Sequence, residues 1–147
     1  MSSQSTAAAT PIKVLVVDDE PAMVALLQEW LKEVECEVYT ALNAADGLNL
    51  FSEHFPTLTI TDLRMPGIDG FELIKRLRHM SDAYIMAFTG LGSEEDLVRG
   101  LELGADEYLM KPLSRLKFLE RVQSILRGAI EPEDPSPDYS DAWLTIN

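Results

Sequence analysis

The stretch LTITDLRMPGIDG, residues 58–70, decides the fold. A short apolar run ends at one carboxylate, Asp62, and a turn stiffened by Pro66 and loosened by Gly67 and Gly70 follows at once. A carboxylate at the end of a buried strand costs free energy unless another group binds it. We therefore expect the rest of the chain to supply groups that bind Asp62.

Four more apolar runs resemble residues 58–61. The runs IKVLVV, EVYTA, LTIT, YIMAFT and YLM predict strands at residues 12–17, 37–41, 58–61, 84–89 and 108–110. Helical periodicity fills the intervals between these runs. The first two predicted apolar helix faces consist of Met23, Leu26, Leu27, Trp30, Leu31 and Val34, and of Ala44, Leu48, Phe51 and Phe55.

Helix starts are also visible in the sequence. Pro21 suits a first helical turn, and Ser93 followed by Glu94 and Glu95 is typical of a capped helix start with acids near the positive end of the dipole. Strands that are each followed by a helix over short connections predict an α/β fold. In such a fold, helices cover both faces of a parallel sheet.

Composition predicts one domain between two polar flanks. The chain has 147 residues, of which 46% are hydrophobic, enough for one core. We predict a flexible N-terminal segment (1–11), the folded domain (12–128) and an acidic, proline-rich tail (129–147). Two interpretations of the tail stay open. It is the start of a linker to an output domain absent from this sequence, or an end whose apolar residues, such as Trp143, anchor a partner or the domain itself.

Charge and cysteine usage exclude several classes of function. The formal net charge of −13 argues against direct nucleic-acid binding, because a phosphate backbone would be repelled. The single cysteine, Cys36, cannot form an internal disulfide and fits a reducing compartment. No apolar run is long enough to span a membrane, and the first residues do not resemble a signal peptide. We expect a cytoplasmic protein without membrane contact.

Polar side chains stand at the carboxyl ends of four predicted strands. Asp18 and Asp19 follow the first strand, Asp62 follows the third, Thr89 ends the fourth and Lys111 follows the fifth. Ligands of open parallel sheets bind at these ends, near the point where the strand order reverses. We therefore expect the five side chains to meet in one crevice.

The residue types in this crevice predict phosphoryl chemistry. Three neighbouring carboxylates repel one another unless a cation lies among them, and Mg²⁺ prefers such oxygen ligands. A hydroxyl from Thr89 and an ammonium from Lys111 suit a phosphoryl group better than a second metal ion. We predict that Asp62 is the nucleophile that becomes phosphorylated, with Mg²⁺ neutralising the developing charge.

Four motifs, in this order, resemble those of the receiver domain of bacterial two-component response regulators, the CheY-like family. The stretch VLVVDDEP (14–21) resembles its acidic-pair motif and DLRMPGIDG (62–70) its phosphoacceptor motif. FTG (88–90) resembles the segment with the switch threonine, and YLMKPL (108–113) the terminal Lys-Pro motif. Four such motifs on the expected strand ends make the resemblance specific.

The resemblance implies a doubly wound, flavodoxin-like five-stranded parallel sheet in the order 2-1-3-4-5. It implies that Asp62 accepts a phosphoryl group from a histidine kinase or a phosphotransfer protein. It also implies that Asp19, Asp62 and the backbone carbonyl of Arg64 ligate Mg²⁺, with Asp18 acting through water. Thr89 would then swing toward the phosphoryl group.

The same resemblance assigns a signalling face. Tyr108 matches the aromatic residue that rotates inward in response. The face formed by the fourth helix, fifth strand and fifth helix then changes its affinity for a downstream effector or a tethered output domain, or for a second copy in a homodimer. A cis peptide is implied between Lys111 and Pro112. Arg64 and Leu91 occupy positions that tune the lifetime of the phosphoryl group.

Two alternatives belong to other functional classes. One is a pseudo-receiver that acts as a constitutive interaction module. The other is a Mg²⁺-dependent phosphatase that uses Asp62 as a nucleophile on outside substrates. Such hydrolases usually carry a second acid two residues after the nucleophile, where this chain has Arg64. We therefore favour a signalling phosphoacceptor over an enzyme with turnover.

Overall fold

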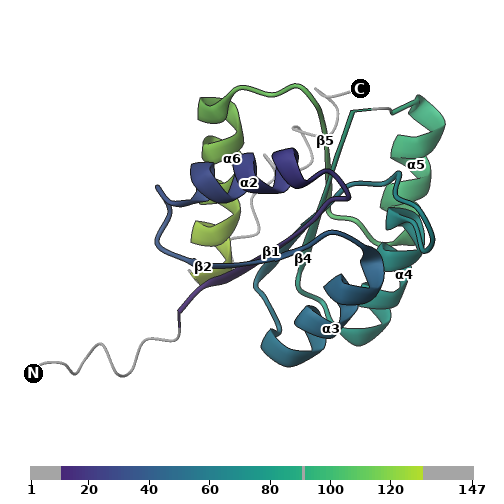
Figure 1. Cartoon of the computed structure of the whole chain (residues 1–147), viewed down its shortest axis with the longest axis horizontal. Coiled ribbons are helices and arrows are strands. Elements are labelled where there is room, and N and C mark those ends of the chain that lie inside the picture. The colour runs from purple at the N-terminus through teal and green to yellow at the C-terminus, as the bar shows by residue number, and fades with distance from the viewer. Residues whose placement is uncertain (1–10, 91, 131–147) are drawn as a thin grey trace, which may run out of the picture.

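The structure of the protein is a computed structural model that describes residues 11–90 and 92–130. The predictions for the N-terminal segment up to residue 10, for Leu91 and for the tail from residue 131 lie outside the described residues. Within the described part, the predicted strands and helices alternate along the chain as expected (Figure 1).

Five parallel strands form one sheet in the order β2-β1-β3-β4-β5, which confirms the predicted topology. The strands are β1 (Lys13–Val17), β2 (Glu37–Ala41), β3 (Leu58–Thr61), β4 (Tyr84–Thr89) and β5 (Glu107–Met110). The helices are α2 (Pro21–Leu31), α3 (Ala44–His54), α4 (Gly70–Met80), α5 (Glu94–Leu103) and α6 (Arg115–Ile130).

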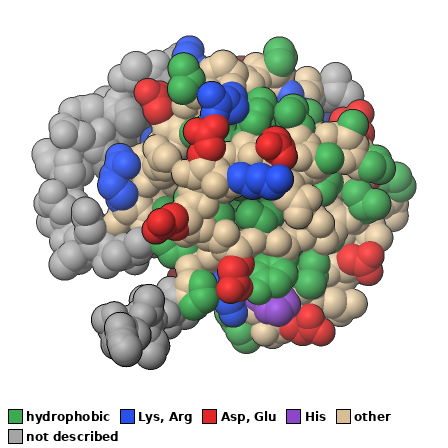
Figure 2. Space-filling model, turned by 60° about the vertical axis from the view of Figure 1, so that its left-hand side comes forward, with side chains coloured by type: hydrophobic (Ala, Val, Ile, Leu, Met, Phe, Trp, Pro, Cys, Tyr) green, Lys and Arg blue, Asp and Glu red, His purple; other side chains and the backbone are tan. Residues whose placement is uncertain are grey.

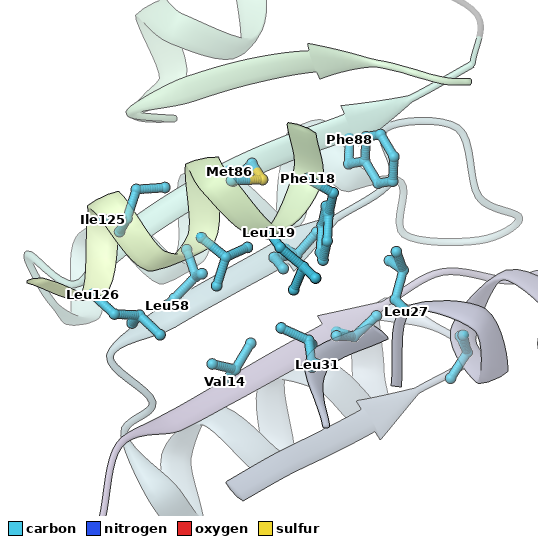
Figure 3. Close-up of a cluster of buried hydrophobic side chains, with 14 residues drawn as sticks. Val14, Leu27, Leu31, Leu58, Met86, Phe88, Phe118, Leu119, Ile125 and Leu126 are labelled. Atoms are coloured by element: carbon cyan, nitrogen blue, oxygen red, sulfur yellow. The ribbon is translucent and has the colours of Figure 1, made fainter. Parts of the chain in front are cut away.

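The interior strand β1 contributes to two core layers because its side chains alternate between the faces of the sheet. Val14 and Val16 pack with α2 and α6, where Leu31 and Phe118 are fully buried (Figure 3). Leu15 and Val17 pack in the second cluster, which contains residues of α3 and α4, with Leu101 of α5 packed against it. Figure 1 shows α2 and α6 on one face and α3, α4 and α5 on the other.

Local signals set the helix starts. Pro21 is the first residue of α2, and the hydroxyl of Ser93 accepts a hydrogen bond from the backbone N–H of Asp96, as the sequence predicts. Asn43 and Asp69 cap α3 and α4 in the same way. These caps satisfy backbone donors that would otherwise lack a partner in the first helical turn.

Two predicted core positions are wrong. Leu26 is 40% exposed, and Val24 instead lies in the core beside Leu27. Phe55 is 63% exposed because it follows the last residue of α3 with a left-handed backbone (φ 46°), which turns its side chain out of the helix face. Val34 lies beyond the end of α2 and packs on the core from the following turn.

The surface carries mixed charge on the face drawn in Figure 2, where acidic and basic side chains alternate with apolar ones. No run of basic side chains gathers among the described residues on that face. Within residues 11–90 and 92–130, no helix has both the length and the apolar character that crossing a bilayer requires.

Candidate functional site

Three carboxylates meet where the chain leaves β1 and β3. The two strands are neighbours, with Val17 opposite Thr61, so Asp18, Asp19 and Asp62 emerge side by side at the same edge of the sheet. One carboxylate oxygen of each lies within 4.8 Å of those of the other two. The structure therefore brings together the acidic residues that the sequence predicts at this edge.

Lys111 reaches the same cluster from the end of β5. Its Nζ donates to Oδ2 of Asp18 at 2.8 Å and to Oδ2 of Asp62 at 3.2 Å. The lysine backbone N–H donates to the carbonyl of Thr89 at 2.8 Å, which extends the β4–β5 pairing by one residue. The peptide between Lys111 and Pro112 is cis, as the resemblance implies.

Burial and charge act in opposite directions on these groups. Burial lowers the pKa of Lys111, but its hydrogen bond to Asp18 and the charges of Asp62 and Asp18 outweigh this effect and raise the pKa. The ammonium therefore stays protonated at neutral pH. Burial raises the pKa of Asp18 more than the hydrogen bond from Lys111 lowers it. The charged groups of the site are therefore partly shielded from water, as is typical of reaction centres.

The loop after β3 holds the Asp62 carboxylate in place. Its Oδ1 accepts the backbone N–H of Leu63 at 2.6 Å and that of Arg64 at 3.3 Å. Gly67 adopts φ 75°, which favours glycine, and the N–H of Gly70 returns to the carbonyl of Leu63 at 3.0 Å. A Cβ on Gly70 would lie 1.9 Å from the backbone oxygen of Asp62. The glycines therefore let the loop fold tightly around the carboxylate.

Two buried hydroxyls stand near this cluster. The Oγ1 of Thr89 and the phenol oxygen of Tyr108 are both buried, and neither has a hydrogen-bond partner among the described residues. Burial raises the pKa of the Tyr108 phenol, an effect that Asp96 strengthens and Arg64 opposes. A buried hydroxyl without a partner costs about 1–3 kcal/mol. Both hydroxyls are therefore free to bind a further acceptor.

An ion pair that the sequence did not predict links the loop after Asp62 to α5. The Nη2 of Arg64 donates to both carboxylate oxygens of Asp96, at 2.8 and 2.7 Å. Asp96 is 8% exposed, and its charge and hydrogen bonds raise the pKa of Arg64. The pair joins the β3–α4 loop to the first turn of α5. Asp96 looks like an ordinary first-turn acid in the sequence, and its partner is 32 residues away, so no local signal reveals the contact.

The cluster fits a hard divalent cation. Asp18, Asp19 and Asp62 offer carboxylate oxygens close enough to share one ion, and such oxygens are the ligands that Mg²⁺ takes. When bound there, Mg²⁺ neutralises charge on oxygens that enter the site. That the backbone carbonyl of Arg64 completes the ligand set remains a prediction.

Comparison with known proteins identifies this arrangement. Residues 14–123 match the family model described as the response regulator receiver domain. The chain belongs to this receiver family. It is 40% identical over 117 residues to a probable transcriptional regulator, ycf27, of Porphyra purpurea, a match that covers 80% of this chain and 48% of the relative. A ycf27 of Guillardia theta is 39% identical over 118 residues, covering 80% of this chain and 46% of the relative. The receiver chain thus spans about half the length of these curated relatives.

Solved structures give the same family. A CheY-like receiver domain protein of Methanospirillum hungatei superposes with a TM-score of 0.78 at 29% identity, covering 82% of this chain and 97% of that one. The chemotaxis protein CheY4 of Vibrio cholerae gives 0.74 at 28% identity, covering 79% and 99%. The receiver is therefore a signalling domain of two-component systems, in which the general role of the family is to accept a phosphoryl group.

Proposed function

We propose that Asp62 of this receiver accepts a phosphoryl group from a phosphohistidine of a histidine kinase or phosphotransfer protein. The observation that carries the proposal is the convergence of Asp18, Asp19, Asp62 and Lys111 at one edge of the sheet. A carboxylate oxygen of Asp62 bonds to phosphorus as the P–N bond breaks, and the electron pair of that bond returns to the imidazole of the donor. The product is an acyl phosphate on Asp62.

The surrounding residues stabilise the transferred group. The ammonium of Lys111 already lies 3.2 Å from the Asp62 carboxylate, so it can bind a phosphoryl oxygen after a small movement. The buried hydroxyl of Thr89 gains an acceptor when the phosphoryl group enters. Mg²⁺ held by Asp18, Asp19, Asp62 and the Arg64 carbonyl would supply the remaining positive charge.

The phosphorylated state is read on another face. We infer that Thr89 and Tyr108 act together as the switch, and that the face of α5, β5 and α6 changes its affinity for an effector, an output domain or a second copy of the chain. The description of the ycf27 relatives as probable transcriptional regulators favours a tethered output that controls transcription. The net charge of −13 argues against direct nucleic-acid contact by this segment.

The rival functions have less support. A constitutive pseudo-receiver does not need three carboxylates and Lys111 in one cluster. The carboxylates repel one another, which destabilises the fold. Phosphatases that use an aspartate nucleophile usually carry a second acid two residues after it; here that residue is Arg64, whose side chain binds Asp96. A signalling phosphoacceptor without turnover on outside substrates, acting in the cytoplasm, fits best.

Intact-mass spectrometry after incubation with acetyl phosphate tests this proposal. We expect a gain of one phosphoryl group that requires Mg²⁺ and disappears in Asp62→Asn. The matched control is Asp82→Asn, since Asp82 is exposed and lies outside the site in the α4–β4 connection. Equal phosphorylation of Asp62→Asn would refute the assignment of the acceptor, and no gain in any variant would favour the pseudo-receiver.

A further inference from the structure

The hydroxyl of Tyr108 occupies a space that exists because residue 92 has no side chain. A Cβ built on Gly92 would lie 1.8 Å from the phenol oxygen and 2.9 Å from Cζ of the ring. Real Cβ atoms essentially never approach other heavy atoms below 3.0 Å. On this backbone, the present position of the ring and a side chain at residue 92 therefore exclude each other.

When a side chain is added at residue 92, we expect the Tyr108 side chain to move. Tyr108 is a long side chain on β5, and its hydroxyl has no hydrogen-bond partner among the described residues that would hold it in place. The other close atom, Sδ of Met110 at 2.9 Å, belongs to a flexible side chain that is 46% exposed and can move cheaply. Gly92 has no left-handed φ, so alanine fits its backbone without strain.

We propose that Gly92 is a positioning residue for the switch, because its missing side chain opens the inward site of Tyr108. The β4–α5 connection that contains Gly92 also joins Thr89 to the first turn of α5, where Asp96 binds Arg64. A side chain at residue 92 holds the ring outward. Phosphorylation of Asp62 then no longer changes the α5–β5–α6 face. This inference rests on the proposed role of Tyr108 as a switch residue.

Carbon NMR of tyrosine labelled at Cζ tests the proposal, with the Tyr108 resonance assigned by its loss in Tyr108→Phe. We expect Gly92→Ala to shift this resonance toward that of a solvent-exposed tyrosine. Gly90→Ala is the matched control in the same connection, because a Cβ there meets only Lys111 carbons at 3.7 Å. An unchanged Tyr108 resonance in folded Gly92→Ala would overturn the proposal.

A double-mutant cycle separates this claim from the proposed function. Urea denaturation should show a lower midpoint for Gly92→Ala alone and no effect of the same change in a chain carrying Tyr108→Leu. If Gly92→Ala alone does not fold, Tyr108→Leu should restore folding, and failure to do so contradicts the inference. Acetyl phosphate should still phosphorylate folded Gly92→Ala. If acetyl phosphate does not phosphorylate the wild type, this result would instead count against the role of Asp62.

Discussion

Replacing Lys111 by methionine tests the electrostatics of the site. The change keeps most of the apolar stem and removes the ammonium that lies 2.8 Å from Asp18 and 3.2 Å from Asp62. Among the described residues, no other side-chain cation lies within hydrogen-bond distance of these two carboxylates. Asp18 is 2% exposed and Asp62 is 9% exposed, so water replaces the lost partner poorly.

The expected loss is about 2–3 kcal/mol of unfolding free energy. Breaking a buried ion pair costs about 3–5 kcal/mol when one charge remains unpaired, and the partial access of water to this edge of the sheet lowers that range. For a domain of this size, the loss corresponds to a Tm about 8–12 °C lower. Thermal unfolding in EDTA measures this loss. Lys117→Met, at an exposed position of α6, is the matched control, and its free energy of unfolding should change by no more than about 0.5 kcal/mol.

Mg²⁺ provides the second half of this test. The ammonium and the cation compete for the same carboxylates, so Lys111→Met should bind Mg²⁺ more tightly than the wild type. Saturation to about a hundred times the dissociation constant adds about 2.7 kcal/mol to the folded state. The Tm gain on adding Mg²⁺ should therefore be larger in the variant. An equal gain, or a variant as stable as the wild type in EDTA, would refute this account of the site.

Three further predictions concern the scaffold. The guanidinium of Arg78 donates to three backbone carbonyls and to Asp106. Arg78→Met should therefore lower the free energy of unfolding, measured in urea, by about 2–4 kcal/mol. The control Lys75→Met, on the exposed face of α4, should change it little. Gly70→Ala should lower the free energy of unfolding by about 3 kcal/mol or more, because the added Cβ meets backbone atoms. Gly128→Ala should raise it by up to about 1 kcal/mol, because nothing lies near the added Cβ. Burial raises the pKa of Cys36, so at pH 8 its thiol should react with iodoacetamide more slowly than in the urea-unfolded chain, and equal rates would contradict its burial.

Regular patterns made the fold predictable from the sequence. All five strands end at the last residue of the predicted runs, because buried parallel strands need uninterrupted apolar residues. The site followed from the same logic, since the carboxyl ends of parallel strands share one edge. Asp62 and Lys111, far apart in sequence, could be placed together on that basis.

Tertiary contacts explain what the sequence did not reveal. The pair of Arg64 and Asp96 depends on how α5 packs beside the β3–α4 loop, and no periodicity encodes that distance. Phe55 follows the helical spacing of α3, but the chain turns at this residue and takes it off the buried face. The space above Gly92 depends on the rotamer of Tyr108, which a sequence pattern does not specify.

The most direct test of the central claim is to locate the phosphoryl group after reaction with acetyl phosphate and Mg²⁺. Borohydride reduces an aspartyl phosphate to homoserine, and tandem mass spectrometry of the digested chain then identifies the modified residue. We predict homoserine at position 62, with Asp18 and Asp19 unmodified. Homoserine at another carboxylate, or an acid-stable phosphate on a serine, threonine or tyrosine, would contradict it.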